Sequence, residues 1–244
     1  MKNILIALLP SIILTSCSTS YYYQICEVES NLTTDNNGAY LYTDSICDIT
    51  YDFWSEGGEI KFFVYNTTDD ILYIDLSKSF IIRNGLAKDY FLGRTTSRTA
   101  GVYTMQGNKS VSVEEQNTTA IPPKSSKIIS EYSILPYRYH DCDLYESPSK
   151  QANAIMTFTE SSTPMIFTNY LTVKAAGGKE KVIKNTFYIS QVSNQHRNAT
   201  LERKNAACET DLFRRQEMFF MQSSPRKFYF KYFPRAQKGT EFKR

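Results

Sequence analysis

Hydrophobic and polar residues alternate along most of the chain, with the period of two that is typical of half-buried β-strands. In the segment 59–66, for example, Ile60, Phe62 and Val64 fall on one face. The turn-forming run 66–70 follows this segment, and the alternation resumes directly after it. We therefore expect a hairpin in which the strands on either side of this turn pair with each other.

The same alternation predicts strands at regular intervals elsewhere, and a second hairpin turn at 175–178, where two alanines precede two glycines. Recurring strands with polar turns between them are typical of antiparallel β-sandwiches. The predicted fold class is therefore all-β, an antiparallel Ig-like β-sandwich formed by residues 21–234 as a single domain. The further strand segments are 80–83, 109–114, 127–134, 155–159, 166–174, 181–191 and 227–233.

One segment near the C-terminus departs from the alternation. Apolar residues such as Leu212 and Phe219 are mixed there with many charges, which predicts one C-terminal helix from about 206 to 221. Ser224 and Pro225 end this segment before the last predicted strand. The final residues, 235–244, are expected to form a basic disordered tail.

The first sixteen residues have the layout of an export signal, with Lys2 followed by the apolar run 4–14. This run is too short to cross a bilayer, which takes roughly 17–25 apolar residues. We therefore predict that residues 1–16 are a leader that is removed.

The four residues LTSC, Leu14 to Cys17, resemble the lipobox of bacterial lipoproteins. The resemblance implies cleavage before Cys17 and acylation of its sulfur and its amine, with residues 17–20 as a short lipidated tether. Burial of the acyl chains, at about 0.8 kcal/mol per methylene, would anchor the mature protein to a membrane. An ordinary secretory signal followed by a coincidental cysteine is the alternative.

The residues after Cys17 indicate the membrane to which the protein is anchored. Segment 18–24 carries no charge, so Ser18 does not match the aspartate that retains many enterobacterial lipoproteins in the inner membrane. The segment also lacks the acidic cluster that marks Bacteroidetes lipoproteins for the cell surface. We therefore expect a protein of the outer membrane that faces the periplasm, with surface exposure as the alternative.

The remaining cysteines fit an exported protein, because an even number is compatible with two disulfides. A turn at 35–38 between two strand-like runs would place Cys26 opposite or diagonal to Cys47, within the Cα distance of about 5.5 Å that a bridge needs. Such a bridge would leave Cys142 to pair with Cys208. Buried free thiols are the alternative.

The sequence contains no glycine-rich phosphate loop, nucleophile elbow, HExxH or CxxC motif. We therefore expect neither an enzyme nor a cofactor. The best cluster of metal-ligating residue types is His140-Asp141-Cys142-Asp143. Adjacent residues on an extended chain point to opposite sides, so at most two of these four reach one ion and no metal site is expected.

Charge is distributed unevenly, although the net charge is only +3. From Leu201 onward the chain has eleven Lys or Arg against five Asp or Glu. A basic C-terminal part favours an anionic envelope component as partner, such as lipid headgroups, lipopolysaccharide phosphates or cell-wall polymer, or another envelope protein. The aromatic and basic run 227–235 would also fit single-stranded nucleic acid, but export argues against that partner.

Several short segments are similar to a group of uncharacterised Bacteroidetes outer-membrane lipoproteins. The resemblance implies membership and an envelope location, and it carries no activity. Within it, Trp54 is expected to pack at one end of the sandwich, while Gly57 and Gly58 supply a hairpin turn. A Trp54 that stacks on a ligand is the alternative. The similar segments are YYYQ at 21–24, DFWSEGG at 52–58, DLSKSF at 75–80, NG at 84–85 and FYIS at 187–190.

Three functions follow as hypotheses. The first is a non-enzymatic, lipid-anchored envelope protein that acts as a structural or interaction module. The second is a surface-exposed glycan-binding accessory, which a solvent-facing aromatic row on one sheet would favour in a chain with 14% aromatic residues. The third is a fimbrial subunit, which is disfavoured because the first arginine of the chain is Arg83, beyond at least three predicted strands.

Overall fold

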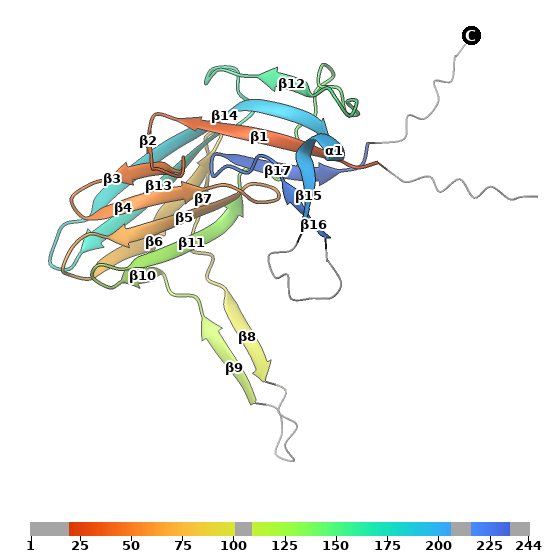
Figure 1. The fold of residues 1–244 in the computed structure, drawn as a ribbon. Coiled ribbons are helices and arrows are strands. Elements are labelled where there is room, and N and C mark those ends of the chain that lie inside the picture. Colours follow the sequence, from red (N-terminus) through yellow and green to blue (C-terminus); the bar gives the residue numbers. More distant parts are fainter. Residues whose placement is uncertain (1–19, 101–108, 206–215, 235–244) are drawn as a thin grey trace, which may run out of the picture.

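The computed structural model describes residues 20–100, 109–205 and 216–234, and consists almost entirely of antiparallel strands, which confirms the all-β prediction (Figure 1). The larger sheet has eight strands in the order β10-β6-β13-β14-β1-β17, with β7 beside β6 and β12 beside β14. Its strands are β1 (Tyr22–Ser30), β6 (Leu72–Arg83), β7 (Leu86–Asp89), β10 (Thr118–Ile121), β12 (Ala154–Thr157), β13 (Ile166–Ala175), β14 (Lys181–His196) and β17 (Lys227–Tyr232).

The second sheet has five strands in the order β11-β5-β4-β3-β2. Two separate strand pairs, β8 with β9 and β15 with β16, complete the described part of the chain. No helix in that part has the length and apolar character needed to cross a bilayer. The remaining elements are β2 (Thr33–Thr34), β3 (Tyr40–Thr43), β4 (Cys47–Asp52), β5 (Glu59–Asn66), β8 (Thr95–Ala100), β9 (Lys109–Glu114), β11 (Ser126–Ser133), β15 (Leu201–Asn205), β16 (Gln216–Phe220) and the short helix α1 (Arg197–Thr200).

One apolar core lies between the two larger sheets, which Figure 1 shows as adjacent layers. The alternation predicted for β5 is present, because Ile60, Phe62 and Val64 are fully buried. Across the interface the rings of Tyr51 on β4 and Phe187 on β14 lie 4.8 Å apart between centroids. Burial of such aromatic rings is the main force that holds the two sheets together.

A small polar network lies within this core. The hydroxyl of Tyr51 accepts hydrogen bonds from the side-chain amides of Asn169 at 2.9 Å and Asn185 at 2.7 Å. Tyr90 in turn donates to Asn169 Oδ1 at 3.0 Å. All four side chains are buried, so each depends on these bonds to offset the loss of water.

The hairpin predicted around residues 66–70 is wrong. The strand before this turn, β5, pairs with β4 and β11, whereas the strand after it, β6, belongs to the other sheet. The turn carries the chain from one sheet to the other. The buried amide of Asn66 fixes this crossover by donating to the carbonyls of Asp70, Ile121 and Pro122. The hairpin predicted at 175–178 is confirmed, since β13 and β14 pair on either side of it.

The strand pairing that motivated a bridge between Cys26 and Cys47 is also wrong. The turn at 35–38 is present, with Gly38 in the left-handed region at φ +80°, but it joins β2 to β3. Cys26 on β1 lies in the larger sheet and Cys47 on β4 in the smaller one. Both are buried free thiols. The pattern around 35–38 identified the turn correctly and its flanking strands incorrectly.

The C-terminal helix predicted over 206–221 is not found where the structure describes that segment. Residues 206–215 lie outside the described residues, and Gln216–Phe220 is the strand β16. β16 pairs with β15, and Phe220 packs against Trp54 and Tyr229. The mixture of charged and apolar residues predicts a helix here, but residues 216–220 instead pair with β15 as a strand and place Phe220 against Trp54. The tail 235–244 also lies outside the described residues.

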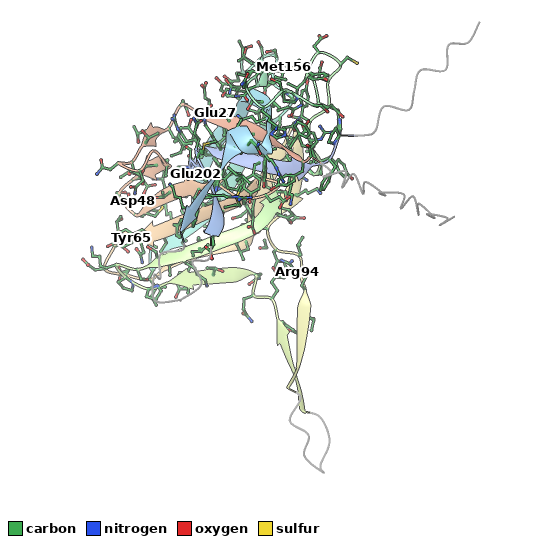
Figure 2. The ribbon with its side chains drawn as sticks, turned by 45° about the vertical axis from the view of Figure 1, so that its right-hand side comes forward. Glu27, Asp48, Tyr65, Arg94, Met156 and Glu202 are labelled. Atoms are coloured by element: carbon green, nitrogen blue, oxygen red, sulfur yellow. The ribbon has the colours of Figure 1, made fainter. Side chains whose placement is uncertain are left out.

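The β8 and β9 pair forms an arm that projects from the rest of the molecule (Figure 1). Arg94 lies where the arm begins (Figure 2). Its backbone amide and that of Leu92 donate to Glu115 Oε2, and its guanidinium lies 3.6 Å from Oε1 of the same carboxylate. Glu115 therefore holds the two ends of the arm together.

Candidate functional site

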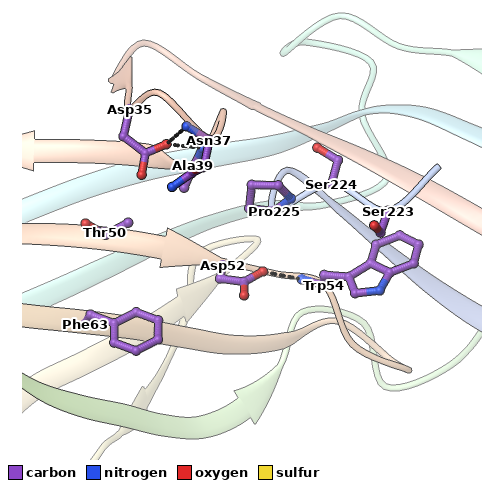
Figure 3. Close-up of a pocket in the computed structure, with 10 residues that line it drawn as sticks. All are labelled: Asp35, Asn37, Ala39, Thr50, Asp52, Trp54, Phe63, Ser223, Ser224 and Pro225. Atoms are coloured by element: carbon purple, nitrogen blue, oxygen red, sulfur yellow. Dashed lines mark hydrogen bonds between the residues drawn. The ribbon is translucent and has the colours of Figure 1, made fainter. Parts of the chain in front are cut away.

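A groove of about 380 Å³ opens beside Trp54 (Figure 3). Its walls come from four parts of the chain: the turn between β2 and β3, the outward side of β4 and β5, the loop after β4, and the loop before β17. A groove of this volume is in the range that binds small-molecule ligands. The lining residues are Asp35, Asn37, Ala39, Thr50, Asp52, Trp54, Phe63, Ser223, Ser224 and Pro225.

The loop after β4 places Trp54 through local hydrogen bonds. Asp52 Oδ1 accepts from the backbone amide of Trp54 at 3.0 Å, which closes an Asx turn. Next to it, the fully buried Phe53 donates its amide to the carbonyl of Pro225 at 2.9 Å. Since Phe53 is fixed in the core and tied to the loop before β17, the indole of Trp54 is held at the edge of the groove.

The ring of Trp54 packs against an aromatic cluster on the outer side of β1 and β17. Its centroid lies 4.9 Å from that of Phe220, edge to face, and 5.2 Å from that of Tyr229. Tyr23 completes this cluster, with its ring 5.1 Å from Phe220. The packing leaves Trp54 half-buried, so the rest of its surface lines the groove. The geometry therefore allows Trp54 both to pack against the domain, as predicted, and to stack on a ligand in the groove, as the alternative proposes.

On the outward side of β5, Phe63 and Tyr65 form a short aromatic row. Phe63 is half-buried and Tyr65 is 36% exposed. Ile128 on β11, the neighbour of Phe63 in the sheet, is 53% exposed. Lys61 Nζ lies 5.3 Å from the Phe63 ring centroid. An apolar surface therefore continues from the groove across the five-stranded sheet.

Two carboxylates face this aromatic surface. Asp35 Oδ1 accepts from the backbone amides of Asn37 at 2.8 Å and Ala39 at 2.9 Å, as drawn in Figure 3. Asp52 uses its Oδ1 in the turn with Trp54. In the described part of the chain, neither Oδ2 atom takes part in a hydrogen bond, and no basic side chain lines the groove. The arrangement therefore offers acceptors and aromatic surface for a ligand that supplies hydroxyl or amino donors.

The other predicted site residues do not gather in this groove. Burial raises the pKa of the Cys26 thiol, and burial with the nearby carboxylate of Asp44 raises that of Cys47 to about 12. These thiols are therefore protonated at neutral pH and shielded from reagents. Cys142 is exposed and forms no disulfide with another described cysteine. Its bridge to Cys208, which lies outside the described residues together with Cys17, stays a prediction.

The segment around His140 is a loop on the surface. His140 Nδ1 lies 3.2 Å from Glu146 Oε1, and the guanidinium of Arg138 lies 2.9 Å from the same oxygen. Asp141 accepts from the backbone amide of Asp143. Among the residues that the structure describes, no group of three or more metal-ligating side chains is found.

Sequence reasoning identified Trp54 and missed the rest of the groove. The outward position of Phe63 follows from the alternation in 59–66, and Asp35 belongs to a turn that the sequence reveals. Ser223 and Ser224 carry no such signal, because hydrogen bonds between the loop after β4 and the chain around β17, such as that from the Phe53 amide to the Pro225 carbonyl, bring them near Trp54.

Comparison of the chain with protein-family models, with curated proteins and with solved structures finds no match.

Proposed function

We propose that this chain is a non-enzymatic, lipid-anchored protein of the bacterial envelope that binds a carbohydrate in the groove beside Trp54. The observation that carries the proposal is the combination of Trp54 and Phe63 with two carboxylates and several hydroxyls in one open groove. Aromatic faces pack against the C–H faces of sugar rings, while carboxylate oxygens accept from sugar hydroxyls. The charged side chains that line the described groove, Asp35 and Asp52, are both acidic and would repel an anionic glycan, while Lys61 lies at its border near the ring of Phe63, so we propose a neutral glycan as the ligand.

The proposed location is the periplasmic side of the outer membrane, with the cell surface as the alternative. It depends on the resemblance of Leu14 to Cys17 to a lipobox and on the uncharged segment 18–24. Membership of the Bacteroidetes lipoprotein group depends on the short similar segments described above. We also propose that residues 21–234 form a single Ig-like β-sandwich domain, which the two antiparallel sheets around one core support.

Replacing Trp54 with alanine is expected to weaken glycan binding by about thirtyfold or more, because buried aromatic anchors at binding sites typically contribute about 2 kcal/mol or more. Binding would be measured by calorimetry against soluble neutral polysaccharides such as a β-glucan, a mannan and a xylan. Asp52→Asn keeps the turn with Trp54 and removes one charge, so it should reduce affinity without changing the fold.

The matched control for this series is Tyr137→Ala, since Tyr137 is 78% exposed and lies outside the groove. Circular dichroism would verify that each variant is folded. If folded Trp54→Ala and Asp52→Asn chains bind the polysaccharides as tightly as Tyr137→Ala, the groove is not the binding site.

Replacing Cys17 with alanine is expected to release the protein from membranes, because the acyl chains that anchor it are attached to this residue. The measurement is the share of protein in the membrane pellet after high-salt and alkaline washing, together with mass spectrometry of the N-terminal peptide. Protease treatment of intact cells separates the two locations, since only a surface protein would be cleaved. A Cys17→Ala protein that stays in the washed pellet would refute lipid anchoring.

A further inference from the structure

The first and last strands of the described chain lie side by side and end at the same edge of the molecule (Figure 1). Tyr22 on β1 is opposite Tyr232 on β17. Just beyond this pair, the rings of Tyr21 and Phe233 lie 6.2 Å apart between centroids, at an angle of 61°. Phe233 is 56% exposed, so a large apolar side chain faces solvent where the chain enters and leaves the domain.

Two cationic side chains lie over the ring of Tyr21. Lys231 Nζ lies 4.4 Å from the centroid of the Tyr21 ring, and the guanidinium carbon of Arg197 lies 5.2 Å from it. Within the described residues, neither Arg197 nor Lys231 forms an ion pair with a carboxylate. We call these four residues the terminal patch: Tyr21, Arg197, Lys231 and Phe233.

The sequence that follows the patch is also basic. Residues 235–244 begin directly after the patch and contain four Lys or Arg against one acidic residue. Cys17 lies four residues before Tyr21, which limits its distance from the patch to about 14 Å even for a fully extended chain. A lipid on Cys17 would therefore hold the patch within about 14 Å of its own point of insertion.

We propose that the terminal patch docks on an anionic lipid surface, so that the domain contacts the membrane by this end instead of moving freely on its tether. Tyrosine and phenylalanine rings favour the interfacial zone of a bilayer, and each lysine or arginine near an anionic surface strengthens attraction. Docking by the patch rests on the proposed lipid anchor at Cys17, since that anchor brings the patch to the membrane. Carbohydrate binding at Trp54 is independent of it.

The test uses the mature chain, residues 17–244, with Cys17→Ser so that no lipid contributes. Binding is measured by sedimentation with vesicles of phosphatidylcholine alone and of phosphatidylcholine mixed with phosphatidylglycerol. We expect binding to the mixed vesicles that weakens as salt increases. The double variant Arg197→Glu/Lys231→Glu should lower this affinity by at least about tenfold, in line with the contribution of single cations near anionic lipids.

The matched control is Lys88→Glu/Lys174→Glu, which makes the same change in net charge. Both lysines are exposed, and they lie on β7 and β13, away from the β1 and β17 edge of the sheet. We expect its affinity to stay within about twofold of the parent chain, because screening confines the effect of distant charges. Equal losses in the two double variants, or no preference for the anionic vesicles, would overturn docking by the patch. Failure of lipid anchoring would instead appear as a Cys17→Ala protein that stays in the washed membrane pellet.

Discussion

Replacing Phe187 with alanine is expected to lower the free energy of unfolding by about 3–5 kcal/mol, the usual cost of deleting a buried phenylalanine ring. Phe187 on β14 is fully buried and contacts four other rings across and along the core. Its centroid lies 4.8 Å from Tyr51 and 5.2 Å from both Phe53 and Phe167, with Tyr40 at 5.7 Å. The deletion would leave a cavity where the two sheets meet.

The measurement for this variant is urea unfolding monitored by circular dichroism, with the midpoint and slope compared to the parent chain. Phe233→Ala is the matched control, because its ring is 56% exposed, and its unfolding should change by less than about 0.5 kcal/mol. If Phe187→Ala were as stable as this control, the two sheets would not share the core described above.

Replacing Tyr51 with phenylalanine is expected to cost about 2–4 kcal/mol, although it removes a single oxygen atom. The side-chain amides of Asn169 and Asn185 would each lose their acceptor while staying buried, and each unsatisfied donor costs about 1–3 kcal/mol. Burial also raises the pKa of Tyr51, so its hydroxyl stays neutral across the accessible pH range.

Tyr137→Phe is the control for this oxygen deletion, because Tyr137 is 78% exposed and its hydroxyl faces water. Its stability should match the parent chain within about 0.5 kcal/mol. The same urea measurement serves for both variants. Equal stability of the Tyr51 and Tyr137 variants would show that the polar network does not contribute to folding.

The positions of most strands follow from the sequence, because the alternation of buried and exposed residues is a local property. The predicted segment 109–114 coincides with β9, and 227–233 extends β17 by one residue. The partner of each strand is not local. Asn66 shows why pairing is hard to predict. An asparagine in a polar turn favours a hairpin, but its side-chain amide instead donates to the carbonyls of residues 121 and 122 and holds a crossover between the two sheets.

The same limit explains the errors in the cysteine and helix predictions. Cys26 was placed opposite Cys47 because a turn lies between them, yet β1 pairs with β14 and β17, strands from the far end of the chain. The segment 216–220 was predicted as helix from its mixture of charges and apolar residues. Its strand conformation depends on pairing with β15 and on the contact of Phe220 with Trp54.

The candidate groove was only partly predictable for a related reason. Trp54 is identified from the sequence because it lies in the DFWSEGG segment that resembles the Bacteroidetes lipoproteins, before the turn expected at Gly57 and Gly58. Its neighbours in the groove come from positions as distant as Asp35 and Ser224. Only the folded arrangement of β3, β4 and β17 brings them together.

The central claim, that the groove beside Trp54 binds a neutral glycan, has a direct optical test. Trp54 is the only tryptophan in the chain, so tryptophan fluorescence reports on this groove alone. Titration with neutral polysaccharides should shift or quench the emission to saturation for at least one of them, and the Phe63→Ala chain should require a much higher concentration. Emission that stays unchanged across the whole panel, in a chain that is folded, would contradict the claim.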